Sequence, residues 1–316
     1  MSQATAMEHE LHVVVTCANR KRHPVPQNLR LQGIRHKQLG ARFDTWIRQL
    51  STSQAEEVSA DQLYGGEHWQ VARTLGQHAA AGGRTAATWV CSAGYGLVPI
   101  TAPLRPYAAT FTFGHPDSVG GTAESVQRWW DHQSNWQGPV AGSPRSLASL
   151  AAQAPGAHLL VVLSAMYLRA CARDLAALAE HLGQSEQLTI ISVGGSAPRE
   201  LREFVLPADG HLQTVVGGTL GALNVRLAAR LLQTAPNTPP NRQAFADGLS
   251  QLRLQAGQRP VFQRTPMTDE QIRAFILERV TEHSTHTAML RQLRSSGLAC
   301  EQRRFAQLFA ATVRSR

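Results

Sequence analysis

Short β-branched runs alternate with amphipathic segments along most of this chain, and this alternation restricts its possible folds more than any other feature. Strands are predicted at His12–Val15, Thr85–Cys91, Ala157–Leu163, Leu188–Val193 and Leu212–Val216. Helices are predicted between and after them, at Leu39–Leu50, Glu67–Ala81, Thr122–His132, Met166–Leu182 and Leu220–Leu232. Strands that alternate with helices favour an α/β fold, in which helices cover both faces of a mostly parallel sheet.

The composition changes where this alternation ends. Residues 1–234 carry the α/β pattern, with a Gly-, Pro- and Ser-rich stretch at 138–145 as a possible internal boundary. Residues 235–242 are rich in Pro, Asn and Thr and predict a linker. We expect a small helical region over 243–316, with helices at Thr268–Val280, Thr287–Arg294 and Cys300–Val313. The last two are separated by a short turn through Gly297, which is the spacing of a helix-turn-helix.

The charge of the chain points to an anionic partner. There are 31 Lys and Arg against 22 Asp and Glu, a net charge of +9, and Lys21 and Lys37 are the two lysines. A GC-rich genome would also favour Arg, but Arg binds phosphates and guanine edges better than Lys does. DNA, or RNA, is therefore the expected partner. No apolar run approaches the ~20 residues of a membrane span, and the N-terminus lacks a signal-peptide pattern, so a cytoplasmic location is expected.

Cys17 is the first candidate for chemistry, because it ends the first predicted strand and precedes a run of basic residues. A nearby positive charge favours the thiolate, which is the nucleophilic form of cysteine. The alternative is a buried cysteine beside solvated charges. The candidates in this segment are Cys17, Lys21 and His23 for catalysis, Asn19 and Arg20 for substrate binding, and Arg22 for nucleic-acid binding.

The remaining cysteines, Cys91, Cys171 and Cys300, are predicted to have packing roles. No Cys-x-x-Cys pair is present, so the sequence indicates no local metal site. The loop from Ser92 to Leu97 has two glycines around a tyrosine, but matches neither the P-loop nor the dinucleotide fingerprint, and no cofactor is expected.

Two glycine-containing turns are candidate binding loops, although each is also consistent with a plain turn. In the first, Ser92, Tyr95 and Gly96 are the candidate substrate contacts. In the second, Gly217 and Gly218 precede a predicted helix, whose amino end can receive an anion.

The predicted C-terminal helices carry polar residues around the turn at Gly297. The nucleic-acid-binding candidates are Arg291, Arg294, Gln302, Arg303 and Arg304. The second helix of a helix-turn-helix lies in the major groove, while other basic residues contact phosphates. A helical bundle that packs on the main domain accounts equally well for the apolar spacing.

Three segments resemble a known family. Thr16–Lys21, Asp61–Gly66 and Cys91–Leu97, with Tyr107 beyond, are similar to an uncharacterised bacterial domain related to the Cys-containing part of archaeosine synthase. Ala18 stands where the archaeal pattern has Ser, and Gly94 stands where the bacterial pattern has Lys. The resemblance covers roughly residues 11–115 and adds Tyr64 and Tyr107 to the substrate-binding candidates.

The resemblance implies a reaction on a 7-deazaguanine base in DNA, within a modification cluster that would supply partner proteins. Hydration of a 7-cyano group to the carboxamide would begin with addition of the Cys17 thiolate to the nitrile carbon. One alternative is a DNA-binding accessory, without catalysis, of a modification or phage-defence system. A second alternative is a nucleoside glycosyl transferase or hydrolase, which the basic charge disfavours.

Overall fold

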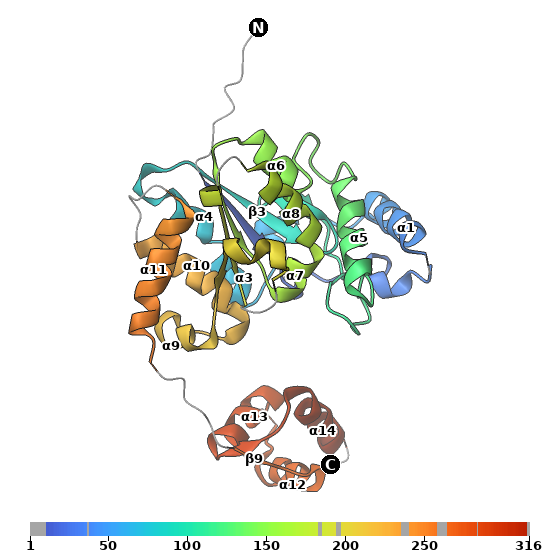
Figure 1. The fold of residues 1–316 in the computed structure, drawn as a ribbon. Coiled ribbons are helices and arrows are strands. Elements are labelled where there is room, and N and C mark those ends of the chain that lie inside the picture. The colour runs from blue at the N-terminus through green and yellow to red at the C-terminus, as the bar shows by residue number, and fades with distance from the viewer. Residues whose placement is uncertain are drawn as a thin grey trace. The chain divides into compact units, whose positions relative to one another are not determined.

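The computed structural model describes residues 11–36, 38–182, 185–193, 197–234, 240–257, 264–282 and 284–314. The chain divides into two compact units, residues 1–258 and residues 259–316. The first unit is an α/β domain and the second is mainly helical (Figure 1).

The α/β unit contains eight named strands and eleven α-helices among its described residues. The strands are β1 (Leu11–Thr16), β2 (Val58–Ser59), β3 (Ala86–Ser92), β4 (Gly96–Pro99), β5 (Pro103–Leu104), β6 (His158–Val162), β7 (Leu188–Ser192) and β8 (Val205–Pro207). The helices are α1 (Leu39–Thr52), α2 (Ala60–Leu63), α3 (Glu67–Ala72), α4 (Leu75–Ala80), α5 (Ala123–Ser134), α6 (Leu147–Gln153), α7 (Ala165–Ala170), α8 (Ala172–His181), α9 (Gln213–Val216), α10 (Leu223–Thr234) and α11 (Arg242–Gln255).

Six strands form the central sheet in the order β4-β3-β1-β6-β7-β8. β1 pairs in parallel with both β3 and β6, and β7 and β8 continue the parallel arrangement, whereas β4 runs antiparallel to β3 at the edge. The chain passes from β1 to β3 on one side and later to β6 on the other. The carboxyl ends of β1 and β6 therefore flank a topological switch point, where open α/β sheets bind their ligands.

Helices cover both faces of the sheet, as the sequence predicts. Figure 1 shows α3, α4, α10 and α11 on one side and α5 to α8 on the other. Every residue of β1, β6 and β7 is buried, as expected for strands covered by helices on both faces. The predicted α/β class is confirmed.

The segment Leu212–Val216 was expected to be a strand, and this prediction is wrong. A 3-10 turn at Gly210–Leu212 leads directly into the short helix α9. The Asp209 side chain accepts a hydrogen bond from the amide of His211, and this cap starts the helical turn. Val215 and Val216 pack on the core from the helix, so their apolar character was misread as a strand pattern.

Two predicted helices are each divided into two. Glu67–Ala81 becomes α3 and α4, and the Thr74 hydroxyl donates to the Val71 carbonyl at the break (2.8 Å). Such side-chain bonds compete with the regular helical pattern. Met166–Leu182 becomes α7 and α8, which meet at Cys171.

The division between the two units lies later than the predicted linker. The linker prediction covers 235–242, of which 235–239 lie outside the described residues. Asn241 caps α11, whose residues Phe245, Leu249 and Leu252 are part of the main core. Because α11 carries this apolar face into the α/β unit, the boundary falls at 258/259 rather than before residue 243.

The stretch 138–145 is not a boundary between units. Arg145 is 8 % exposed, and its guanidinium donates to the carbonyls of Trp136, Tyr95 and Leu97. Burial lowers the pKa of Arg145 to about 10. The hydrogen bonds of Arg145 thus connect the loop at 138–145 to the β3–β4 hairpin.

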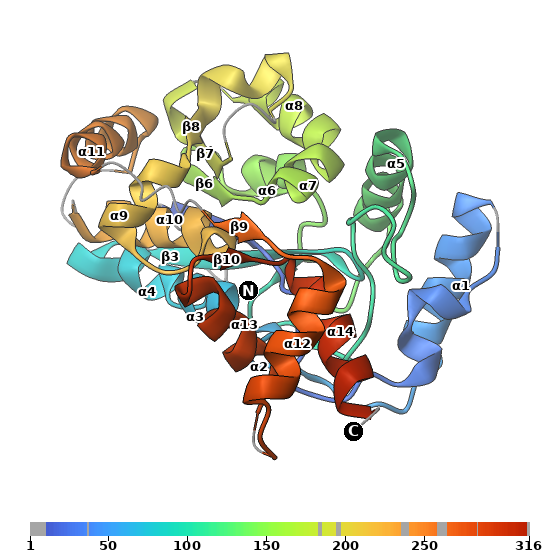
Figure 2. The same ribbon diagram turned by 90° about the horizontal axis from the view of Figure 1, so that it is seen from below.

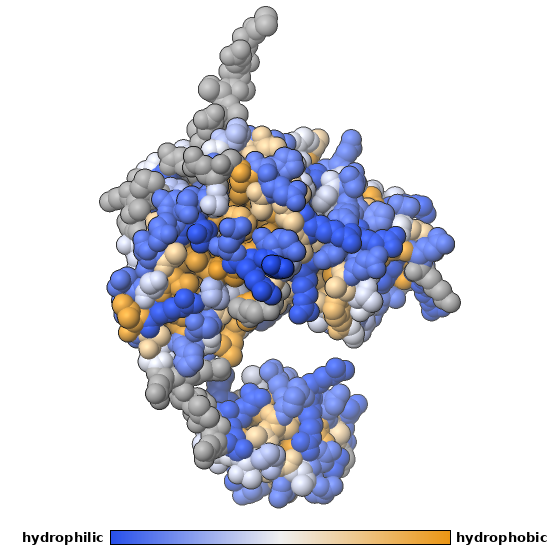
Figure 3. All heavy atoms as spheres, in the orientation of Figure 1, coloured by the Kyte–Doolittle hydropathy of each residue, from blue (hydrophilic) through white to orange (hydrophobic). Residues whose placement is uncertain are grey.

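The C-terminal unit has a core of its own. It consists of β9 (Thr265–Pro266), α12 (Asp269–Arg279), α13 (His286–Ser295), β10 (Leu298–Ala299) and α14 (Gln302–Arg314), with β9 and β10 paired in parallel (Figure 2). The buried hydrophobic residues of this core are Ile272, Phe275, Ile276, Met289, Leu290, Leu293, Cys300, Phe305 and Leu308. Hydrophilic residues cover most of its visible surface in Figure 3. All three helices predicted here are confirmed.

Among the described residues, no single helix has both the length and the apolar character needed to cross a membrane. One pair, Gly210–Val216 with Leu220–Thr234, meets both criteria when taken together, but it is bent by 87°.

Candidate active site

Cys17 lies directly after β1, beside the switch point of the sheet. Its amide donates to the carbonyl of Cys91 at the end of β3 (2.9 Å), so the backbone is still held by the sheet at this position. Cys17 is 7 % exposed. The predicted position at the carboxyl end of a buried strand is confirmed.

Two tyrosine hydroxyls from distant parts of the chain reach the sulfur of Cys17. The Tyr167 hydroxyl, on α7, lies 3.0 Å from Sγ, and the Tyr107 hydroxyl donates to Sγ at 3.6 Å. Tyr167 was not identified from the sequence. The only signal for it was its place just after β6, at the carboxyl edge that a parallel sheet uses for ligands.

Tyr107 belongs to a buried cluster of hydroxyl groups. Its oxygen lies 2.7 Å from Ser92 Oγ and 3.0 Å from the hydroxyl of Tyr64. Burial raises the pKa of Tyr64, Tyr107 and Tyr167 well above the ordinary tyrosine value, so all three remain protonated at neutral pH. The structure thus brings together Ser92, Tyr64 and Tyr107, which were predicted as substrate contacts, around Cys17.

The turn between β3 and β4 holds this cluster in place. Ser92 Oγ accepts from the amides of Gly94 and Tyr95, at 3.2 and 3.0 Å. A Cβ atom at Gly94 would lie 2.4 Å from the Tyr107 ring, so a residue with a side chain would displace that ring. Glycine at position 94 is therefore required for the approach of Tyr107 to Ser92.

The ammonium of Lys21 lies over two rings of the cluster, those of Tyr64 and Tyr107. It donates to the carbonyls of Ala18 (2.8 Å) and Asn19 (3.2 Å), and lies 4.4 Å from the centre of the Tyr107 ring. Burial lowers the pKa of Lys21 to about 8, although Cys17 and Asp117 act in the opposite direction. At neutral pH, Lys21 supplies a partly buried positive charge beside the cluster.

Lys21 and Tyr107 also line a cavity of about 260 Å³. Its lining includes the potential cations Lys21, His23, Arg30 and His115. Asn19 also lines it, and Asp117 places one carboxylate there. The predicted residues Asn19, Lys21, His23 and Tyr107 thus share one hollow, whereas Arg20 and Arg22 are exposed.

At the other candidate substrate-binding positions, the polar groups already bond to other parts of the protein. Tyr95 is 3 % exposed, and its hydroxyl accepts from the amide of Arg105 (3.0 Å); Gly96 is also buried. Near Gly217 and Gly218, the amide of Thr219 donates to Glu67 Oε1 at 3.1 Å. The carboxylate of Glu67 therefore already takes the position that was expected for an anionic ligand.

The nucleic-acid candidates of the C-terminal unit differ in their freedom to contact a partner. Arg291, Gln302 and Arg303 are exposed. Arg294 donates to the carbonyl of Cys300 (3.0 Å), and Arg304 Nε donates to Asp269 Oδ1 (2.8 Å). The last two side chains bond within the unit, whereas the first three are exposed at its surface.

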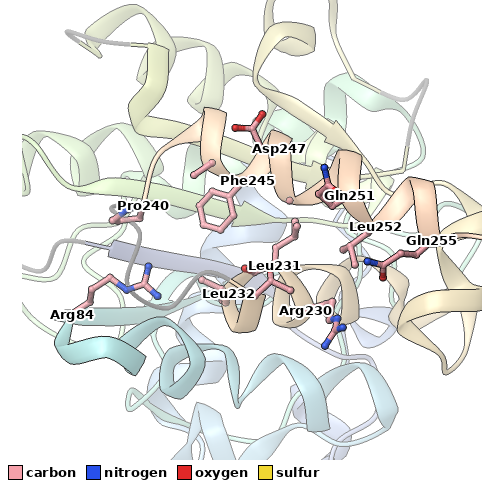
Figure 4. A pocket seen from close by; sticks show the side chains of 13 residues that line it. Arg84, Arg230, Leu231, Leu232, Pro240, Phe245, Asp247, Gln251, Leu252 and Gln255 are labelled. Carbon is pink, nitrogen blue, oxygen red and sulfur yellow. Dashed lines mark hydrogen bonds between the residues drawn. The ribbon is translucent and has the colours of Figure 1, made fainter.

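A second hollow, of about 380 Å³, lies between α10 and α11 (Figure 4). Leu231, Phe245 and Leu252 line its apolar floor, and Arg230 and Asp247 lie at its rim. The amino end of α10 is beside β6, since Asn224 donates to the Leu163 carbonyl (2.7 Å), and the hollow is at the other end of α10. It is therefore remote from Cys17.

Comparison of the chain with models of protein families, curated proteins and solved structures found no match. Within the described part of the chain, no group of three or more His, Cys, Asp or Glu residues is placed to hold a metal ion. The candidate site is therefore defined by the geometry around the Cys17 sulfur.

Proposed function

We propose that this protein converts a 7-cyano-7-deazaguanine base in nucleic acid to the carboxamide, with Cys17 as the nucleophile. The observation that carries the proposal is the contact of the Cys17 sulfur with two tyrosine hydroxyls, at 3.0 and 3.6 Å. The O–H group of Tyr107, which donates to the sulfur, stabilises the negative charge that the sulfur carries as a thiolate. The choice of base follows the resemblance of the three sequence segments.

A nitrile is a suitable electrophile for a cysteine sulfur that is largely buried. The cyano group is a linear rod of two atoms, so it can reach Cys17, which is 7 % exposed, without burial of the whole ring. Addition of the thiol gives a thioimidate. Water then adds to the thioimidate carbon, and cleavage of the C–S bond releases the carboxamide and restores the thiol.

The basic surroundings suit a substrate that is part of a polymer. Arg20 and Arg22 are exposed beside the cavity residues Lys21 and His23, and these side chains would hold the phosphates next to the modified base. A base in a duplex would first have to leave the stack, at a cost of a few kcal/mol.

Replacement of the nucleophile tests this proposal. Cys17→Ala should abolish formation of the carboxamide from DNA that contains the cyano base, as measured by nucleoside mass spectrometry. The affinity for that DNA should remain within about twofold, because the phosphate contacts are unchanged. Cys300→Ser, a change in the other unit, is the matched control and should keep the wild-type rate. Full turnover by Cys17→Ala would rule out the thiolate mechanism.

The second candidate is a DNA-binding accessory without catalysis. The exposed Arg291, Gln302 and Arg303 on the C-terminal unit favour it, because they leave polar side chains free for a partner. In that case the wild-type protein would bind the same DNA tightly and leave the cyano base unchanged.

A further inference from the structure

The directions of the hydrogen bonds in the hydroxyl cluster can be derived from the backbone. Ser92 Oγ accepts from two amides, those of Gly94 and Tyr95, and an amide N–H can only donate. Both lone pairs of Ser92 Oγ are therefore occupied. Its own proton must be donated to its remaining partner, the oxygen of Tyr107 at 2.7 Å.

The directions of the hydrogen bonds of Tyr107 are then fixed as well. Its proton is donated to the sulfur of Cys17, so the bond to Tyr64 at 3.0 Å must run from the Tyr64 hydroxyl to the Tyr107 oxygen. The Tyr107 oxygen accepts from Ser92 and from Tyr64, which fills both of its lone pairs. Tyr107 can stabilise a thiolate, but it cannot accept the proton that Cys17 must lose.

The hydrogen bond of Tyr167, unlike those of Tyr107, can run in either direction. Among the residues that the structure describes, Cys17 is the one hydrogen-bond partner of the Tyr167 hydroxyl, at 3.0 Å, and either atom can donate. Its ring packs edge-on against Phe111, with the ring centres 4.9 Å apart, so the hydroxyl is held beside the sulfur. Tyr167 can accept the thiol proton and donate its own.

We propose that Tyr107 is a fixed hydrogen-bond donor to Cys17, and that Tyr167 is a catalytic proton carrier between the thiol and the nitrile nitrogen. The inference rests on the proposed function. As the S–C bond forms, the Cys17 proton moves to the Tyr167 oxygen, and the Tyr167 proton moves to the nitrogen. One C–N π bond is lost, the product is S–C(=NH), and Tyr167 ends as a neutral phenol.

Two small reagents separate these roles without the DNA substrate. 2-Cyanopyrimidine, a heteroaromatic nitrile, needs a proton on its nitrogen as the thioimidate forms, whereas iodoacetamide alkylates the thiolate and releases iodide. Labelling of Cys17 is followed by peptide mass spectrometry. Tyr167→Phe should slow the nitrile reaction by at least about tenfold, but change alkylation by less than about threefold. Tyr107→Phe should slow both reactions by the same factor.

Met166→Leu, a change on α7 next to Tyr167, is the matched control and should behave as the wild type with both reagents. In D2O, the wild-type nitrile reaction should slow more than alkylation does, which tests proton transfer without any variant. If Tyr167→Phe affects both reagents equally, or neither, the assignment of Tyr167 is wrong while Cys17 remains the nucleophile. If the wild-type protein forms no nitrile adduct, the proposed function itself fails.

Discussion

Cysteines of the α/β unit differ sharply in what their sulfur atoms touch. Cys91 and Cys171 are 0 % exposed, and burial beside Cys91 raises the pKa of Cys171 well above the ordinary thiol value. The packing role predicted for both is consistent with these contacts. Cys17, by contrast, touches two hydroxyl groups and lies near the charge of Lys21. The local sequence alone could not separate a reactive thiol from a packed one.

The partly buried ammonium of Lys21 should make the free energy of unfolding depend on pH. Burial lowers its pKa to about 8 in the folded protein, against 10.5 in an exposed lysine. Between these two values the unfolded chain binds a proton that the folded chain does not, so the free energy of unfolding rises with pH across this window. Below pH 8 both states are protonated, and the cost of burying the charge is fully present.

Lys21→Met removes this dependence. From pH 7 to pH 9.5, the free energy of unfolding of the wild type should increase by about 2 kcal/mol relative to the variant. Urea unfolding of both proteins at the two pH values measures this change. The contributions of other titrating groups to the free energy of unfolding are the same in both proteins and cancel. A difference that does not change with pH would show that Lys21 titrates normally.

At the scale of the elements, the sequence predicts what depends on local pattern. Continuous apolar runs such as His12–Val15 predicted buried parallel strands, and the positions of the loops after them followed. The hydroxyl cluster was beyond such a prediction, because Ser92, Tyr64 and Tyr167 come from separate segments that only the packing brings together. The short helix α9 was missed because two valines in sequence suit a strand or a helix that packs on a core.

The β3–β4 hairpin depends on Arg145, a residue far away in the sequence. Arg145→Met would leave the carbonyls of Trp136, Tyr95 and Leu97 without this donor in a buried region. Each buried acceptor that loses its partner costs about 1–3 kcal/mol, so the variant should lose several kcal/mol of stability in urea unfolding.

Arg145→Lys is the appropriate comparison, because an ammonium keeps the charge but lacks the planar fork of a guanidinium. It should recover only part of the lost stability. Because Ser92 ends β3 in this hairpin, both variants should also slow the alkylation of Cys17 by iodoacetamide. An Arg145→Met protein with wild-type stability would contradict this account of the hairpin.

For the whole molecule, the presence of two separate cores determines which functions can be tested independently. The C-terminal unit buries Ile272, Phe275 and Phe305 in its own cluster, whereas α11 belongs to the α/β core. A protein that ends at residue 258 should therefore keep the unfolding transition of the α/β unit, and should keep the labelling of Cys17 by 2-cyanopyrimidine. Loss of that transition would mean that the α/β unit requires the C-terminal residues.

The exposed arginines of the C-terminal unit allow a direct test of its contribution to DNA binding. If Arg291 and Arg303 each contact a phosphate, the double change to Ala should weaken binding to any DNA sequence, and should reduce the slope of log affinity against log salt by about 2. Arg314→Ala is the control for each single change, because it removes one positive charge from the far end of α14, where the side chain donates to Ala310 (3.0 Å). Equal changes of the slope per charge removed would indicate attraction by net charge alone. A slope that changes only with Arg291 and Arg303 would identify the end of the unit that faces the nucleic acid.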